Sequence, residues 1–395
     1  MEKVPPQDIH RRLTGFQAAL AAADLDSALL FQNVDIFYFS GTIQSSVLFI
    51  PAEGRPILMV QKGFQRVKEE SPLETIVAVN GKSHLTATLR DFGVRRIGSM
   101  GLEMDVLPAQ LYLWVEQSFP QCRFTDVSGL IRKQRMIKSP YEIEQIRKAA
   151  SILHQGYMEI QAFIHEGVSE LEIDGRLAFI ARREGHMGVL RMRGWNQEMT
   201  YAHVLSGESG SVVSFLNSPH GGSGNTPAMA QGAGFRRIRK NEPIGIDYGV
   251  GINGYLADQF RTFVIGDLPP ELDKAHQCSK EIHDLFAREA KPGVPCDRLY
   301  AMARDVALRA GFGETFMGHG EGQVRFIGHG LGLEIDELPL IAPHFVEGLA
   351  PGMVLAFEPK FVFPEKGVVG MEDDYLVTSS GVERITLTEQ ELIRL

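Results

Sequence analysis

Residues 246–263 read IDYGVGINGYLADQFRTF and carry two aspartates, Asp247 and Asp258, on either side of a glycine-rich stretch. The glycines and the asparagine favour a turn, and the flanks alternate in the way of two strands. A hairpin that turns near Gly251 places Asp247 opposite residue 256 and makes Asp258 its diagonal neighbour, about 7–8 Å away on the same face. Carboxylates at that separation can converge on a pair of metal ions about 3.5–4 Å apart. Taken alone, two aspartates near a turn favour an acidic hairpin that faces solvent.

Three later segments each add one residue that can bind a metal ion. His329 stands between two glycines in FIGHGLGLE, so the backbone can approach closely and no bulky neighbour screens the ring. Glu358 ends the apolar run GMVLAFEP, and Glu372 lies in a second strand-like run, GMEDDYLV. A carboxylate in such a run is costly to bury unless it is paired or bound to a metal. A lone His or Glu is more often a satisfied core residue, but Asp, Asp, His, Glu, Glu in this order is far more specific.

With these five residues in this order, the chain resembles the M24 metallopeptidase family of methionine aminopeptidase, aminopeptidase P and prolidase, which has the "pita-bread" fold. Residues 135–143, RMIKSPYEI, resemble the opening of that family's catalytic domain. Residues 33–41, NVDIFYFSG, resemble the amino-terminal domain of prolidases and creatinases. The resemblance implies a creatinase-like α/β domain over residues 1–130. It also implies an α+β pita-bread catalytic domain with an antiparallel sheet over residues 131–395.

Local patterns favour the same organisation. The first part of the chain alternates helix and strand, with a helix expected over residues 9–23 and buried strands over residues 28–31, 47–50 and 56–60. Two capping boxes, Ser139 with Glu142 and Ser169 with Glu172, predict where two helices of the second domain begin. The first of these helices is expected to reach residue 163, and two more are expected near residues 271–290 and 296–310. Helices combined with antiparallel strands predict an α+β domain.

The resemblance also implies a role for each of the five residues. Asp247 would chelate one of two divalent ions, His329 and Glu358 would hold the other, and Asp258 and Glu372 would bridge them. Glu358 would also take the proton of the attacking water and return it to the leaving amine. Four carboxylates balance the charge of two divalent ions, and the mixed histidine–carboxylate set suits Mn, Co, Fe or Zn. The implied reaction is hydrolysis of Xaa-Pro peptide bonds.

The segment 206–234 is rich in Gly, Ser and Pro and predicts a long loop or an irregular strand pair. Within it, NSPHG resembles the family's segment that carries an active-site histidine, which makes His220 a candidate catalytic residue. The gap from His220 to Asp247 is longer than is usual for prolidases. An ordinary loop histidine therefore stays open as an alternative, with His203 as the nearest competitor.

The residues expected around the substrate depart from the family pattern. Asp336 replaces a histidine that would donate a hydrogen bond to the substrate, and an acid there could bind a cationic group. Leu340 and Gly370 stand where relatives carry arginines, while Lys360 and Arg325 replace a glycine and a histidine. Asp336, Lys360 and Arg325 are therefore candidate substrate-binding residues, although Lys360 and Arg325 could equally be structural surface charges. The positions of the metal ligands match the family pattern, whereas the positions expected around the substrate differ from it.

Composition narrows the classes of function. The formal charge of -9 argues against nucleic-acid binding, and the densest basic run, RRIRK at residues 236–240, is better explained as a solvated strand edge. Cys122, Cys278 and Cys296 are too widely spaced for a disulfide framework or a zinc cluster and indicate reduced thiols. No apolar signal core opens the chain, and no run approaches the roughly 18 residues of a membrane span. We therefore expect a cytoplasmic protein.

Two other functions stay open. One keeps the fold and changes the bond, as in relatives that act on ectoine or sulfonium compounds, which gives a small-molecule amidohydrolase or lyase. The other is a non-catalytic binding module, against which the five retained ligands and the acidic charge argue. In the leading interpretation the partner is a small peptide or a small amide, and the protein is a homodimer, as prolidase-like relatives commonly are.

Overall fold

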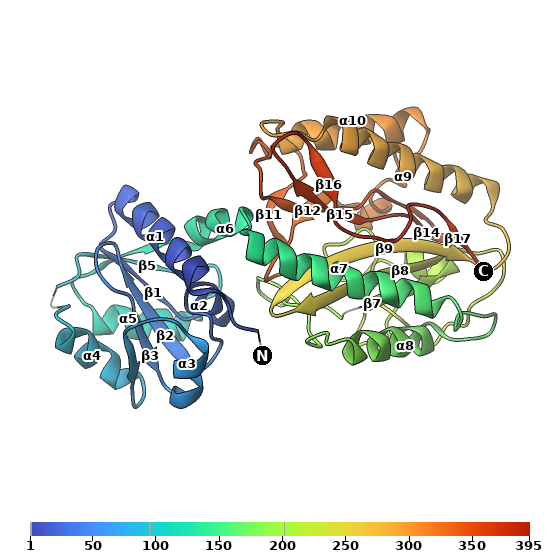
Figure 1. Ribbon diagram of the computed structural model, residues 1–395. Helices are drawn as coiled ribbons and strands as arrows, with labels where there is room; N and C mark the ends of the chain where they lie inside the picture. Colours follow the sequence, from blue (N-terminus) through green and yellow to red (C-terminus); the bar gives the residue numbers. More distant parts are fainter. Residues whose placement is uncertain (1, 95, 201) are drawn as a thin grey trace. The chain divides into compact units, whose positions relative to one another are not determined.

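The computed structural model describes residues 2–94, 96–200 and 202–395, and the chain divides into two units, residues 1–135 and 136–395 (Figure 1). The boundary falls in the last turn of the helix α6 (Ser128–Met136), slightly beyond the predicted division after residue 130. Among the described residues, no helix combines the length and the apolar character that a membrane crossing requires.

The first unit contains one six-stranded sheet, formed by β1 (Ser27–Leu30), β2 (Ser46–Pro51), β3 (Ile57–Val60), β4 (Ile76–Ala78), β5 (Ser99–Leu102) and β6 (Arg123–Asp126). The strand order is β4-β3-β2-β1-β5-β6. β2 runs antiparallel to both of its neighbours, and the remaining pairs are parallel. The apolar runs expected to form strands are β1, β2 and β3, and they are almost wholly buried. The prediction of an α/β first domain is confirmed.

The helices of the first unit that precede α6 are α1 (Pro6–Ala22), α2 (Asn33–Ser40), α3 (Phe64–Glu70), α4 (Leu85–Asp91) and α5 (Ala109–Ser118). Two of the sequence motifs meet here, because Asp35 of α2 and Arg135 of α6 form an ion pair at 2.8 Å. Both side chains are buried. Removing one partner of a buried ion pair strongly destabilises a protein, so this contact fixes α2 against α6.

The strands of the second unit are β7 (Ala202–Ser206), β8 (Ile244–Ile252), β9 (Tyr255–Val264), β10 (Gly328–Gly330), β11 (Glu337–Leu340), β12 (Val354–Phe357), β13 (Lys360–Phe363), β14 (Gly367–Gly370), β15 (Asp373–Val377), β16 (Val382–Arg384) and β17 (Ile393–Arg394). Within the part of the unit that the structure describes they form three sheets, with the orders β17-β9-β8-β7, β11-β10-β12-β15-β16 and β13-β14. β17 joins β9 in parallel, and the other paired strands of this unit run antiparallel.

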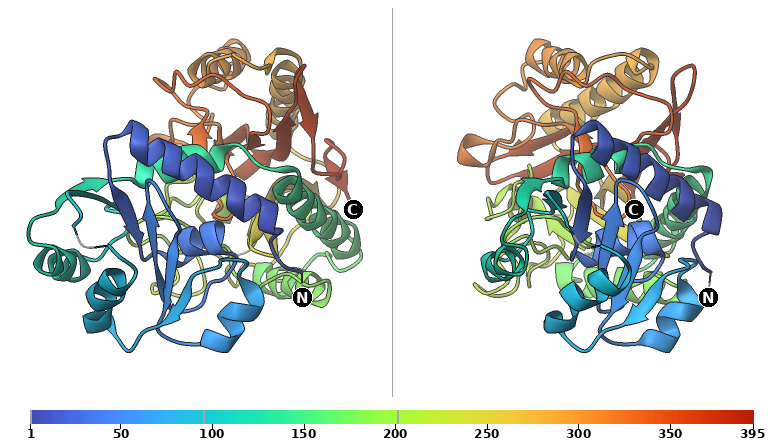
Figure 2. Two further views of the ribbon diagram at one scale, coloured as in Figure 1. Left: turned by 60° about the vertical axis from the view of Figure 1, so that its left-hand side comes forward. Right: turned by 90° about the vertical axis from the view of Figure 1, so that its left-hand side faces the viewer.

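The helices of the second unit are α7 (Pro140–Ile160), α8 (Glu170–Arg183), α9 (Pro270–Glu289) and α10 (Cys296–Arg309). Both predicted capping boxes are present at the starts of α7 and α8. α7 packs on β8 and β9 and α8 on β7, whereas α9 packs on β13, β14 and α10. Figures 1 and 2 show the two helix pairs on opposite sides of the strands of this unit. The second unit is therefore α+β with antiparallel sheets, as predicted.

Arg261 of β9 connects the strands of the second unit. Its guanidinium group has five N–H donors, and all five are used. One donates to the Asp373 carboxylate at 2.7 Å, and the others donate to the backbone carbonyls of Phe260, Glu372, Thr388 and Glu389. Burial raises the pKa of Asp373, but the guanidinium outweighs burial and holds that pKa below its ordinary value. The buried pair thus fixes the backbone directly after Glu372.

We expect Arg261→Met to lower the free energy of unfolding by about 3–5 kcal/mol, because it removes the cation that hydrogen-bonds to the buried Asp373 carboxylate. Urea unfolding followed by circular dichroism measures the change. Arg239→Met is the matched control, since Arg239 is exposed. Equal midpoints for the two variants would contradict the role given to Arg261.

Candidate metal centre

The five predicted metal ligands lie in or beside strands that are far apart in the sequence. Asp247 belongs to β8, Asp258 to β9 and His329 to β10, while Glu358 follows β12 and Glu372 lies between β14 and β15. Asp247 is partly exposed, and the other four are buried. The hairpin of β8 and β9 is therefore part of the interior of the unit, which excludes the alternative of an acidic hairpin that faces solvent.

The hairpin turns later than the glycine pattern suggested. Asn253 and Gly254 have φ values of 50° and 95°, and such positive values are what a tight two-residue hairpin turn requires. Asp247 consequently pairs with Phe260 rather than with the predicted partner four residues earlier, which corrects the predicted register. Asp258 nevertheless stays a diagonal neighbour of Asp247 on the same face of the sheet. The register differs from the prediction by four residues, an even number, so each side chain keeps its face.

The glycines on either side of His329 allow close backbone contacts. A Cβ atom on Gly328 would lie 2.5 Å from the carbonyl oxygen of Ala356, and one on Gly330 would lie 2.1 Å from that of Leu338. Any side chain at either position would force β10 away from its neighbours. The motif therefore sets His329 deep between β11 and β12, as its glycines suggested.

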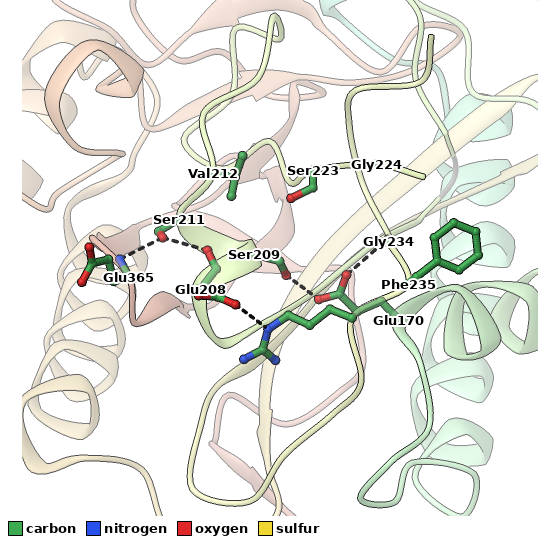
Figure 3. A pocket seen from close by; sticks show the side chains of 11 residues that line it. Glu170, Glu208, Ser209, Ser211, Val212, Ser223, Gly224, Gly234, Phe235 and Glu365 are labelled. Carbon is green, nitrogen blue, oxygen red and sulfur yellow. Dashed lines mark hydrogen bonds and ion pairs between the residues drawn. The ribbon is translucent and has the colours of Figure 1, made fainter. Parts of the chain in front are cut away.

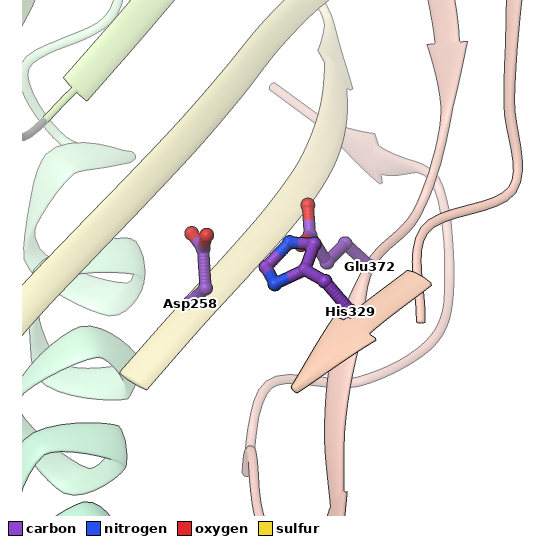
Figure 4. A group of neighbouring side chains, drawn as sticks. All are labelled: Asp258, His329 and Glu372. Atoms are coloured by element: carbon purple, nitrogen blue, oxygen red, sulfur yellow. The ribbon is translucent and has the colours of Figure 1, made fainter. Parts of the chain in front are cut away.

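Asp258, His329 and Glu372 together can hold a metal ion (Figure 4). One ligand atom of each lies within 4.8 Å of the others. Nδ1 of His329 lies 3.1 Å from the Gly330 carbonyl oxygen, which can only accept, so Nδ1 carries the proton and Nε2 keeps its lone pair. Nε2 also lies 3.7 Å from Oε1 of Glu358. A histidine nitrogen among carboxylate oxygens is a donor set for Mn, Co, Fe or Zn.

Lys360 of β13 reaches into the same cluster. Its Nζ donates to Oδ2 of Asp247 at 3.0 Å, Oε2 of Glu358 at 2.8 Å and Oε2 of Glu372 at 2.6 Å. Nζ also lies 5.0 Å from the centre of the Phe260 ring. Burial lowers the pKa of Lys360, but the three carboxylates outweigh burial and hold that pKa well above its ordinary value. The lysine is therefore a buried ammonium ion at the centre of three predicted metal ligands.

The carboxylates of the cluster differ in their electrostatic surroundings. At Asp247, burial raises the pKa, but the positive charge of Lys360 outweighs it and the pKa falls below its ordinary value. At Asp258 and Glu372, burial and the neighbouring carboxylates raise the pKa well above its ordinary value. The ammonium ion thus compensates the Asp247 side more fully than the Asp258 side, where a further cation would find uncompensated negative charge.

Both histidine candidates lie beside Asp247. Nε2 of His220 is 3.0 Å from Oδ2 of Asp247, and burial together with the charge of Lys360 lowers the pKa of His220 to about 4. His203 pairs with Asp247 across β7 and β8, and its Nε2 faces Oε1 of Gln231 at 3.2 Å. The two rings meet edge to face with centroids 5.9 Å apart. His220 makes the direct contact, and His203 lies behind it.

The three candidate substrate-binding residues have quite different surroundings. Asp336 is half-exposed, and its Oδ1 lies 3.4 Å from Nδ1 of His329. Arg325 is exposed. Lys360 is only 1% exposed, and its partners are predicted metal ligands. Its burial corrects the alternative of a surface charge at this position, whereas substrate binding by Lys360 stays a prediction.

Residues around the ligands were not identified from the sequence. Oδ2 of Asp374 accepts the backbone N–H of Asp258 at 3.0 Å, and Thr386 accepts the backbone N–H of Asp374 at 3.1 Å. Asp373 and Arg261 hold the backbone beside Glu372. The run of three acids, Glu372 to Asp374, in an apolar strand was a visible signal, but only the fold shows which carboxylate faces the cluster.

A pocket of about 420 Å³ lies beside the glycine- and serine-rich segment and separate from this cluster (Figure 3). None of the predicted site residues lines it. Glu170, which lines it, accepts hydrogen bonds from the backbone N–H groups of Ser206 and Gly234 and from the Ser209 hydroxyl. Its carboxylate therefore has a structural task, joining α8 to the segment that follows β7.

Both units of the chain match known protein families. Residues 144–379 match the model of metallopeptidase family M24, and residues 12–137 match that of the creatinase/prolidase N-terminal domain. The Xaa-Pro dipeptidase of Pyrococcus furiosus is 26% identical over 371 residues, which cover 93% of this chain and 95% of that protein.

Solved structures agree in fold over nearly the whole chain. An Xaa-Pro dipeptidase from Bacillus anthracis has a TM-score of 0.84 at 27% identity, covering 98% of this chain and 100% of the other. The X-Pro aminopeptidase from Thermotoga maritima has a TM-score of 0.80 at 25% identity, with 98% and 99% covered. Both parts of the chain therefore have relatives of the kind that the sequence motifs indicated.

We expect Mn²⁺ to raise the thermal midpoint of the wild-type protein and to lose that effect in Asp258→Asn. A ligand at a hundred times its dissociation constant stabilises the folded state by about 2.7 kcal/mol, and the variant removes a ligand oxygen from the candidate site. Differential scanning calorimetry with and without Mn²⁺ measures the shift. Asp267→Asn is the control, because that side chain is 91% exposed. An undiminished shift in Asp258→Asn would contradict the assignment of this ligand.

Proposed function

The chain belongs to metallopeptidase family M24, and from this premise we propose that it hydrolyses Xaa-Pro peptide bonds with the help of bound divalent metal ions. The observation that carries the proposal is the convergence of Asp247, Asp258, His329, Glu358 and Glu372 in one buried cluster. Relatives of similar length that match the chain almost end to end are described as Xaa-Pro dipeptidases, which supports the same substrate class.

We propose that Asp258, His329 and Glu372 hold a metal ion, with Oε1 of Glu358 beside them as the proton acceptor. A divalent ion bound there supplies Lewis acidity, which polarises a carbonyl group and acidifies water. The identity of the metal, Mn, Co, Fe or Zn, is left open by this donor set. The count of two ions per chain, with Asp247 as a further ligand, stays a prediction.

Glu358 is the residue we propose to move the proton. Its Oε2 accepts a hydrogen bond from Lys360, whereas its Oε1 faces the His329 side of the cluster. Oε1 can take a proton from the attacking water as the oxygen bonds to the scissile carbonyl carbon. When the carbon–nitrogen bond breaks, the same oxygen returns the proton to the leaving nitrogen.

His220 is proposed to act as a neutral ring, because burial and the charge of Lys360 hold its pKa at about 4. A neutral imidazole offers one donor and one acceptor. Nε2 lies 3.0 Å from Oδ2 of Asp247, although the contact lacks hydrogen-bond geometry. Neither ring nitrogen has a hydrogen-bond partner among the described residues, so the neutral ring can still donate to Asp247 and accept from a group that enters the site.

A second function, hydrolysis or lyase chemistry on a small molecule, is favoured by one observation. Asp336 places a half-exposed acid 3.4 Å from the ring of His329. A free peptide carboxylate would be repelled there, whereas a cationic small substrate would be attracted. Assays of Xaa-Pro peptide hydrolysis distinguish the two functions, because only the peptidase requires a peptide bond before proline.

We further propose a cytoplasmic homodimer that acts on small peptides. The acidic composition supports the exclusion of nucleic acid as a partner. Sedimentation equilibrium should give twice the chain mass of 43.8 kDa. An active species that sediments only as the monomer would contradict the dimer.

We expect a free Xaa-Pro dipeptide to be a poorer substrate than a longer or carboxy-blocked Xaa-Pro peptide. Asp336 repels the terminal carboxylate of a dipeptide, and Lys360 is already bonded to three carboxylates. A charge-assisted contact is worth roughly 1.5–3 kcal/mol, which is about ten- to a hundredfold in specificity. Values of kcat/KM for Ala-Pro, Ala-Pro-amide and a longer Ala-Pro peptide measure the preference.

Asp336→His provides the matched comparison, because it should raise kcat/KM on the dipeptide more than on the longer peptide. A wild type that prefers the free dipeptide tenfold or more would overturn this account of the substrate shell. Full activity after thorough chelation would overturn the metal dependence itself.

A further inference from the structure

We propose that Lys360 is a built-in cation of the metal centre, whose ammonium group takes the place of one of the two divalent ions. The centre then holds one metal ion, at Asp258, His329 and Glu372, with Lys360 on its Asp247 side. This inference rests on the proposed function, because it concerns the same cluster. Relative to the predicted two-ion centre, it reduces the number of metal ions to one and assigns the second positive charge to the lysine side chain.

The contacts of Lys360 leave no place for a metal ion beside it. An ammonium group has three N–H donors, and here each has its own carboxylate, at Asp247, Glu358 and Glu372. A metal ion bound to the same oxygens would lie about 2.0–2.2 Å from each of them. It would then sit against Nζ with no ligand between two positive charges. The two cations therefore exclude each other on the Asp247 side.

The ligands that Lys360 does not use are enough for one ion. The hydrogen bonds to Lys360 occupy Oε2 of both Glu358 and Glu372. Oε1 of Glu358 turns instead toward His329, at 3.7 Å from Nε2. Asp258, His329 and Glu372 each offer one ligand atom within 4.8 Å of the others, and together they form a mixed oxygen–nitrogen set. Catalytic sites with three protein ligands and one open position are a common arrangement for a single ion.

The backbone makes room for the lysine. Lys360 pairs with Gly370 across β13 and β14. A Cβ atom on Gly370 would lie 2.9 Å from Cα and 3.4 Å from Cγ of Lys360, so any side chain there would press on the lysine. Positions 360 and 370 are two of the places where the sequence departs from the family resemblance. Their pairing in one ladder makes the two departures parts of a single rearrangement.

The lysine is also held in place by its surroundings. Its side chain is 1% exposed, and the face of the Phe260 ring lies 5.0 Å from Nζ. A buried ammonium that left these three carboxylates would lose all of its hydrogen bonds. Lys360 is therefore a fixed component of the site rather than a mobile side chain that a second ion could displace.

The test is the number of metal ions bound by the full-length protein. Wild type, Lys360→Gly and Lys366→Gly are stripped with chelator, dialysed against graded Mn²⁺ and counted by native mass spectrometry and elemental analysis. We expect one ion in wild type and two in Lys360→Gly, which vacates the second position. Lys366→Gly should bind one ion like wild type, because Lys366 lies in the same hairpin with a side chain 54% exposed.

Two ions, or none, in the wild type would overturn the proposal, and this result does not depend on any variant. One ion in a folded Lys360→Gly would overturn it as well, and Lys360→Ala repeats the count if the glycine variant does not fold. Hydrolysis of Ala-Pro peptides is measured separately. A one-ion protein without such hydrolysis would refute the proposed substrate and leave this inference standing.

Discussion

Four carboxylates buried in one cluster require positive charge among them. Two like charges 4 Å apart repel by about 4 kcal/mol at the effective dielectric constant near a protein surface, and several such pairs would exceed the stability of a typical domain. Asp247, Asp258, Glu358 and Glu372 can remain ionised together only beside cations. Lys360 supplies one positive charge from within the chain. In the proposed centre, one divalent ion on the Asp258 side would supply two more positive charges, which leaves the cluster with a single net negative charge. The antiparallel sheets of the second unit serve to bring these charges to one place and hold them there.

Buried hydrogen bonds and close contacts between strands hold the ligands of the cluster in place. Arg261 uses all five of its donors, one on the Asp373 carboxylate and four on backbone carbonyl groups that include the carbonyl of Glu372. Asp374 holds the backbone of Asp258. The glycines beside His329 let three strands approach within contact distance. Preorganised ligands of this kind give a site its geometry before an ion binds, and the outer hydrogen bonds orient the ligands themselves.

Much of this arrangement could be predicted from the sequence. The order of the five ligands, the capping boxes of α7 and α8 and the buried strands of the first unit are local signals, and the structure contains each of the elements they predict. The hairpin register was wrong, because the turn is set by the positive φ of Asn253 and Gly254 rather than by the earlier glycines. Lys360 could not be placed, because its role depends on a contact with Asp247 more than a hundred residues away. Long-range pairing of this kind leaves no periodic pattern in the chain.

The most direct test of the one-ion centre is a crystal structure of the protein grown with saturating Mn²⁺. Anomalous data are collected on both sides of the manganese absorption edge. We expect one anomalous peak, bounded by Asp258, His329 and Glu372, with Nζ of Lys360 among the oxygens of Asp247, Glu358 and Glu372. Two peaks within the cluster, with Lys360 turned away, would contradict it. The absence of any peak would contradict the metal centre altogether.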